Sequence, residues 1–324
     1  MNVSVRTLTL AAKTYAARSK SLSNTSFRCA SNAASNHEGH EDPYTYCRNL
    51  VQKRDYEGFL VSQLCPKHKI GGYFALRAFY TELAGLPESV SNVMIGKMRL
   101  QFWRDAIRGI ADGRPPHHPI ALALSDTAQH ANLPSYHLRR IVDARESELE
   151  NPIYLTMDSL TSHAESTSST SFYLLLSLLN LSSDTYSHAA SHLGVATGLT
   201  TLLRALPYHV SKGRMVIPAE ITAKHDVNQD EVFRKGPHVQ GIEDAVFEFA
   251  TVANDHLITA REMFKETDGR VPRVAMPVFA AGLPVGSYLK RLEEVNFDVF
   301  HPSLQLRDWK LPWRVWRSYY KCTF

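Results

Sequence analysis

The chain has 324 residues, of which 44% are hydrophobic, so it can bury a large core in one or two domains, and the composition excludes a disordered protein. The formal net charge of +4 is concentrated at the ends: residues 1–37 carry +5, residues 307–324 carry +4, and the residues between them sum to −5. A body of that sign lacks the clustered cations that neutralise phosphates, so we expect no binding to nucleic acid. The four cysteines form no CxxC pair, which predicts ordinary reduced thiols: Cys29, Cys47, Cys65 and Cys322.

The first segment is typical of a mitochondrial transit peptide. It is rich in Ser, Ala and Thr, its five basic residues precede the first carboxylate at Glu38, and it has no continuous apolar stretch like that of a secretory signal. We therefore expect residues 1–42 to be a transit peptide and disordered leader, although a disordered cytosolic tail is the alternative. The run from His37 to His40 does not match the HExxH zinc motif.

No stretch reaches the roughly 18 consecutive apolar residues of a membrane span. The longest candidate, residues 172–181, is too short and contains Ser177 and Asn180. With a transit peptide, this predicts a protein of the mitochondrial matrix, soluble or peripheral to the membrane.

From about Tyr44 to Phe300 the apolar residues recur at intervals of three and four, which predicts helices. We expect a single all-α domain over residues 43–300, followed by a tail over residues 301–324. The clearest predicted helices are Gly72–Leu86, Val93–Ile110, Leu138–Glu150, Ser169–Leu181, His188–Leu206 and Glu243–Phe264.

Prolines predict the breaks between these helices, because proline cannot continue the ladder of backbone hydrogen bonds. The breaks are expected at Pro66, Pro87, Pro115, Pro116, Pro134, Pro152 and Pro218. The Ser/Thr-rich stretch from Thr161 to Ser171 has two interpretations, a linker or a helix of small residues that packs closely on a neighbour.

Several strings resemble the squalene/phytoene synthase family. They are Gly72–Tyr80, Phe102–Arg104, His118–Pro119, Leu193–Leu199 with Leu203–Arg204, and Gly213–Pro218. The resemblance implies the fold of that family, an isoprenoid-synthase-type helical bundle. Together the strings are specific, whereas any one of them alone is weak.

The sequence is still more similar to one branch of this family, which acts in the assembly of respiratory complex I. The strings that carry this resemblance are Phe74–Phe79 with Glu82–Ala84, Met98–Trp103, His188–His192, Leu203–Ala205 with Pro207–His209, and Asn296–Asp298 with Phe300–Gln305. The branch implies a non-catalytic role early in complex I biogenesis, on the matrix side of the inner membrane. It also implies complex I subunits or other assembly factors as partners, with peripheral membrane contact.

A working synthase of this family ionises a prenyl diphosphate through Mg²⁺ ions held by two aspartate-rich motifs on facing helices. At the first motif this chain has Ala84, Gly85 and Glu88, and Pro87 is expected to end the helix and turn Glu88 away from the site. At the second motif it has Ala205 and His209, and residues 185–219 contain no carboxylate. We therefore predict no catalytic residue, no metal and no cofactor, and His209 alone is a poor metal ligand.

Four cations match positions near the diphosphate of a working relative: Arg77, Arg204, Lys212 and Arg214. They have two interpretations, contacts to an anionic ligand or ordinary ion pairs within the protein. Asp143, Glu146 and Glu150 form an acidic stripe at helical spacing, and Glu148 resembles an acidic position of the synthases. The favoured interpretation of all four acids is a solvated helix face.

The C-terminal tail combines aromatic and basic residues. Trp309, Trp313, Trp316 and Tyr320 share one predicted helical face, which Phe324 continues, with Arg314, Arg317 and Lys321 beside it. This pattern suits a membrane interface, so the membrane-contact candidates are Trp309, Trp313, Arg314, Trp316, Arg317 and Tyr320. The alternative is a helix docked on the body through its aromatic rings.

Two further functions stay open beside the assembly factor. One is a prenyl-diphosphate-binding or prenyl transferase-like protein with an atypical, metal-poor site. The other is a carrier of a lipid or prenyl chain that kept the cavity and lost the chemistry.

Overall fold

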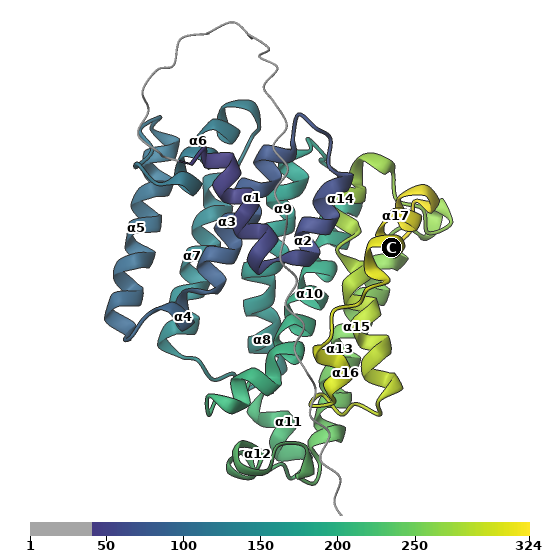
Figure 1. The fold of residues 1–324 in the computed structure, drawn as a ribbon. Coiled ribbons are helices and arrows are strands. Elements are labelled where there is room, and N and C mark those ends of the chain that lie inside the picture. Colours follow the sequence, from purple (N-terminus) through teal and green to yellow (C-terminus); the bar gives the residue numbers. More distant parts are fainter. Residues whose placement is uncertain (1–40) are drawn as a thin grey trace, which may run out of the picture. The chain divides into compact units, whose positions relative to one another are not determined.

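The computed structural model describes residues 41–324, and every regular element in this part of the chain is helical (Figure 1). The transit peptide predicted within residues 1–42 lies outside the described residues except for its last two positions. Cys29 and the run from His37 to His40 also lie outside them. The prediction of an all-α fold is confirmed.

The first half of the described chain runs from α1 to α9. Its helices are α1 (Pro43–Arg54), α2 (Tyr56–Val61), η1 (Ser62–Leu64), α3 (Ile70–Ala84), α4 (Leu86–Ser89), α5 (Val93–Ala111), α6 (Pro119–His130), α7 (Ser135–Glu150), α8 (Met157–Ala164), the π-helix η2 (Glu165–Ser169) and α9 (Thr170–Leu178).

The second half supplies the long central helix α10 and the helices packed beside it. Its helices are α10 (Asp184–Ser211), α11 (Ala219–Lys224), α12 (Gln229–Lys235), η3 (Gly236–His238), α13 (Ile242–Glu262), η4 (Lys265–Thr267), η5 (Arg273–Ala275), α14 (Met276–Phe279), α15 (Gly282–Glu294), α16 (Pro302–Gln305) and α17 (Leu311–Lys321).

The helix boundaries follow local capping chemistry. The Asp42 side chain accepts a hydrogen bond from the Thr45 backbone N–H at 3.0 Å at the start of α1, and Asn92 accepts one from Ile95 at 2.9 Å at the start of α5. Such caps satisfy backbone N–H groups that have no partner within the helix. The predicted proline breaks fall between helices or at helix starts, as at Pro134, the N-cap of α7.

The stretch from Thr161 to Ser171 is helical, so the linker interpretation is wrong. It contains the end of α8, the π-helix η2 and the start of α9. Its buried hydroxyls are satisfied: Thr167 Oγ1 donates to the His163 carbonyl at 2.8 Å, and Ser169 Oγ donates to the Ser191 carbonyl of α10 at 2.6 Å. These small side chains allow η2 to pack directly on α10.

Helix α10 is longer than its prediction, which ended at Leu206. It continues through Pro207 to Ser211 and keeps His209 on the same helix as Ala205. Proline removes one backbone donor, but burial of Leu203, Leu206 and Val210 along the helix offsets that loss.

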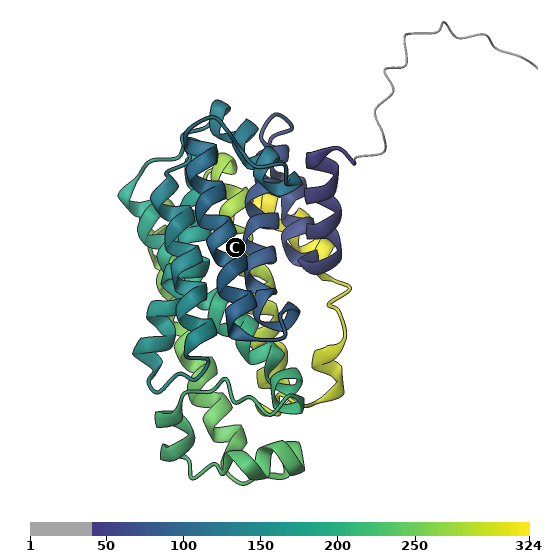
Figure 2. The same ribbon diagram turned by 90° about the vertical axis from the view of Figure 1, so that its left-hand side faces the viewer.

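The core lies between long helices whose axes are roughly aligned, as two perpendicular views show (Figures 1 and 2). Helices α10 and α13 share the most extensive contact, and the core contains the fully buried rings of Phe79, Phe172, Phe249 and Phe279. Burial of such rings provides the main stabilisation of a helical bundle. Among residues 41–324, no helix combines the length and the apolar character that crossing a bilayer requires.

Candidate functional site

A cavity of about 320 Å³ lies between α3, α7, the α8–η2 segment and α10. The two segments compared above with the aspartate-rich motifs both face it: Ala84 and Glu88 from the first, Ala205 and His209 from the second. The fold therefore brings these two segments together around one space. Gly85, which follows the last residue of α3, is not part of the cavity lining.

The expectation that Pro87 turns Glu88 away from the site is wrong. Helix α3 does end at Ala84, but Pro87 lies at the start of the next short helix, α4, where a missing N–H costs little. That helix carries Glu88 back to the cavity.

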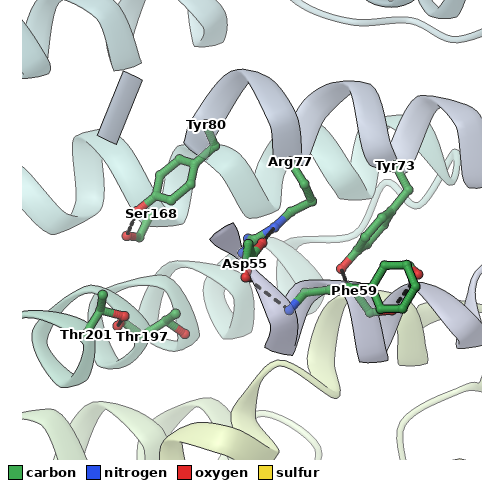
Figure 3. Close-up of polar contacts among 10 residues, drawn as sticks. Asp55, Phe59, Tyr73, Arg77, Tyr80, Ser168, Thr197 and Thr201 are labelled. Carbon is green, nitrogen blue, oxygen red and sulfur yellow. Dashed lines mark hydrogen bonds and ion pairs between the residues drawn. The ribbon is translucent and has the colours of Figure 1, made fainter. Parts of the chain in front are cut away.

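Helix α3 presents three polar side chains toward the cavity, Tyr73, Arg77 and Tyr80 (Figure 3). Their spacing of four and three residues places them on one helix face. The Arg77 guanidinium donates to Asp55 from Nε at 2.7 Å, and Tyr80 shares a 2.7 Å hydrogen bond with Ser168 of η2. The Asp55 carboxylate also caps α2 by accepting from the Gly58 N–H at 3.1 Å.

A second ion pair faces the same cavity from α10. Arg204 lies 2.5 Å from the carboxylate of Glu57, which is on α2 directly after the Asp55 cap. The two acids of this short segment thus hold one cation from α3 and one from α10. Of the two interpretations of Arg77 and Arg204, the structure shows the ion pairs.

The third pair is the most deeply buried. Arg145 and Glu148 of α7 are 2.7 Å apart, and His163 of α8 lies 3.6 Å from the same carboxylate. Burial alone raises the pKa of Glu148, but the Arg145 guanidinium and His163 oppose it, and the net pKa is below the ordinary value. Burial lowers the pKa of His163 to about 4, so this imidazole is neutral near pH 7.

The interpretation of Glu148 as part of a solvated helix face is therefore wrong. The acids of the 16-residue helix α7 lie on different faces of the helix, and Glu148 is on the face that lines the cavity. Its neighbours Asp143, Glu146 and Glu150 do reach solvent. They also pair with α5: Asp143 and Glu146 with Arg104, and Glu150 with Lys97.

The cavity retains polar groups without partners. Arg214 lines it and forms no ion pair within residues 41–324. In the same range the buried Arg145 Nε–H donates no hydrogen bond, and the buried Tyr154 hydroxyl forms none. Burial and then Arg214 lower the pKa of His209, although Glu88 and Glu148 act in the opposite direction. Lys212, the fourth cation of the sequence prediction, is exposed and is not part of the lining.

These residues do not fit a Mg²⁺ cluster. Of the lining carboxylates, Asp55, Glu57 and Glu148 are each bound to an arginine, which leaves Glu88 as the one lining acid without an ion pair inside residues 41–324. Within the same range no group of three or more His, Cys, Asp or Glu side chains is arranged to hold a metal ion. Mg²⁺ needs several oxygen ligands around one point. In this cavity three of the four lining carboxylates are instead paired with guanidinium groups.

The tail residues lie apart from the cavity. The helix α17 docks through Leu311, Val315 and Ser318, with Tyr319 partly buried beside them. The predicted aromatic face, which includes Trp313, Trp316 and Tyr320, is exposed, so docking through that face is wrong. Phe324 does not continue that face, because its ring is buried against Phe264 and Phe279. The Arg314 guanidinium contacts the Asp308 carboxylate at 3.2 Å and the Ser287 hydroxyl at 2.6 Å.

Part of the site could not be read from the sequence. Asp55, Glu57, Tyr80 and Tyr154 were not predicted as cavity residues, yet all four line it. The position of Asp55 before a short helix is a visible capping signal. Its pairing with Arg77, which is 22 residues away, depends on the packing of α2 against α3.

Comparison with known proteins agrees with this fold. The family model described as squalene/phytoene synthase matches residues 51–317. The solved structure of squalene synthase HpnC from Alicyclobacillus acidocaldarius superposes with a TM-score of 0.69 at 16% identity, covering 79% of this chain and 94% of that one. The chain belongs to the squalene/phytoene synthase family.

More similar relatives identify the branch. The Bos taurus protein named NADH dehydrogenase (ubiquinone) complex I, assembly factor 6 is 39% identical over 279 residues, which is 85% of this chain and 82% of the relative. The Drosophila melanogaster homolog of that factor is 35% identical, over 84% of this chain and 82% of the relative. The resemblance to this branch that the sequence strings predicted is thereby confirmed.

Proposed function

We propose that this protein is a non-catalytic assembly factor for mitochondrial respiratory complex I. The similarity over most of the chain to relatives named for that role carries the proposal. The cavity supports it, because three of its four lining carboxylates are paired with the guanidinium groups of Arg77, Arg145 and Arg204. A chain that keeps the fold and changes the metal site in this way is suited to binding rather than to turnover.

The finer points of the proposal come from the sequence. The factor acts early in complex I biogenesis, at the matrix side of the inner membrane, where it contacts complex I subunits or other assembly factors. Residues 1–42 direct import, residues 43–300 form the working domain, and residues 301–324 form a tail. Ala84, Gly85, Glu88, Ala205 and His209 are the positions at which the metal site was lost.

The test is deletion of this protein from its own cells. We expect the amount of assembled complex I to fall severalfold on native gels, because unassembled intermediates are not carried forward. Reintroducing the full chain restores complex I, and complex IV measured in the same samples stays unchanged as the control. Normal complex I in the deleted cells would contradict the proposal.

A second candidate is a protein that binds a prenyl diphosphate or another lipid without converting it. The observation in its favour is the set of unpartnered groups in the cavity lining, Arg145 Nε, the Tyr154 hydroxyl and Arg214. These groups would face an anionic head while the rest of a lipid lies along the apolar wall. Native mass spectrometry distinguishes the candidates, since a carrier co-purifies with lipid.

A further inference from the structure

The aromatic tail face is an exposed surface made by Trp309, Trp313, Trp316 and Tyr320. Trp309 comes just before α17 in the chain, and the other three residues belong to α17. This helix lies next to α15 at the edge of the described unit (Figure 1). The opposite side of the helix is buried through Leu311, Val315 and Ser318. The helix is therefore fixed to the body by a different face from the one that carries its rings.

More than half of the surface of each of these four residues is exposed, so their rings contribute little to the buried core. Trp309 is 82% exposed, Trp313 and Trp316 are each 56% exposed, and Tyr320 is 59% exposed. The Trp316 and Tyr320 ring centres are 4.8 Å apart, so these two form one continuous patch. Scattered exposed apolar residues are normal on a soluble protein, but four large exposed rings within residues 309–320 indicate a binding surface.

The charge around the rings has one sign. Lys310 lies 5.3 Å from the Trp309 ring centre and Arg317 lies 5.2 Å from that of Trp313, while a shallow groove beside Trp316 and Tyr320 is also lined by Lys67 and Arg273. Asp308 is the one acid among residues 307–324, and it is held by Ser287 and Arg314. No carboxylate of the tail is left to neutralise these cations.

We propose that the aromatic tail face binds the surface of a lipid bilayer that contains anionic headgroups. Indole and phenol rings prefer the headgroup level, where their apolar bodies leave water and their polar edges remain hydrated. Cations beside them then meet lipid phosphates, with α17 lying along the surface. The cations Lys310, Arg317 and Lys321 match a surface of lipid phosphates, so we take a bilayer as the occupant rather than a protein groove.

The measurement is binding of the purified full chain to phosphatidylcholine vesicles with and without about one third phosphatidylglycerol. The five basic residues of the leader would also attract anionic lipid, so all variants carry glutamine at Arg6, Lys13, Arg18, Lys20 and Arg28. In this background we expect binding to the anionic vesicles and at least about tenfold weaker binding to the neutral ones.

Paired variants locate the surface. We expect binding to the anionic vesicles to weaken about tenfold in the double variant Trp313→Ala with Trp316→Ala. In the double variant Arg317→Gln with Lys321→Gln we expect it to weaken about fivefold for each cation removed. The matched controls lie on other helices: Met94→Ala with Met98→Ala removes side chains that are 68% and 67% exposed, and Arg139→Gln with Arg140→Gln removes two exposed cations. Both controls should bind as the parent does.

Tryptophan fluorescence gives a second readout that needs no variant. Trp103 is only 3% exposed, so the other three tryptophans, all in the tail, report on the surface. We expect their emission to shift to shorter wavelength on anionic vesicles and to be quenched by brominated lipid. Binding without this shift, or tail variants that bind as well as the parent, would overturn the inference. The assembly role is measured separately through complex I, so neither result decides the other.

Discussion

Replacing Glu148 with alanine is expected to lower the free energy of unfolding by about 3–5 kcal/mol, because it leaves a buried cation without its counter-charge. Arg145 is nine-tenths buried, its Nε already lacks a hydrogen bond within the described chain, and Glu148 is its one ion-pair partner there. His163, which shares that carboxylate, is neutral near pH 7 because its pKa is about 4, so it does not take over the charge. Urea unfolding at pH 7 measures the loss.

The same helix provides the control. Glu150 is paired with Lys97 at the surface, so Glu150→Ala should leave the urea midpoint nearly unchanged. Replacing both members of the buried pair, Arg145→Met with Glu148→Leu, should recover most of the stability, since no charge is then left unpaired. A loss from Glu148→Ala as small as that from Glu150→Ala would show that the pair is not buried as described.

Substituting Gly194 with alanine is expected to lower the free energy of unfolding by about 2–3 kcal/mol, because overpacking a rigid contact costs this much. An added methyl group at this position overlaps the backbone of Ser169 in the π-helix η2. Backbone cannot rotate aside as a side chain can, so α10 and η2 must separate. That movement also displaces Ser168 from its bond to Tyr80 at the cavity.

Gly286 on α15 is the matched glycine. A methyl group there meets only the end of the flexible Arg261 side chain and a methyl of Leu257. Because alanine is the better helix former, Gly286→Ala should leave stability unchanged or raise it slightly. Equal effects of the two substitutions in thermal unfolding would show that the contact between α10 and η2 is not tight.

The sequence was most informative where helix periodicity and proline agreed. The predicted helix from Val93 to Ile110 differs from α5 by one residue at its end, because Asn92 caps its start and the apolar spacing is regular. It was least informative at Thr161–Ser171 and at Pro207. There the helix is maintained by packing of η2 on α10 and by burial along α10, which no local propensity reveals.

The candidate site, like the fold, could be predicted from the sequence only in part. The strings around Arg77, Ala84, Arg204 and Ala205 indicated which segments face each other, and the cavity has all four in its lining. The partners of the arginines were not readable, because Asp55 and Glu57 lie far from them in sequence. Long-range ion pairs are set by tertiary packing, so the pairing of these arginines became visible only in the structure.

The central claim is that this chain keeps the fold of a prenyl synthase without its metal chemistry. The most direct test is pyrophosphate release by the purified protein from farnesyl or geranylgeranyl diphosphate in the presence of Mg²⁺, beside a bacterial squalene synthase as the active control. The account predicts release no faster than in protein-free buffer, because three of the four cavity carboxylates are bound to Arg77, Arg145 and Arg204, and Glu88 alone cannot hold a Mg²⁺ cluster. Mg²⁺-dependent release that disappears on chelation of the metal would contradict it.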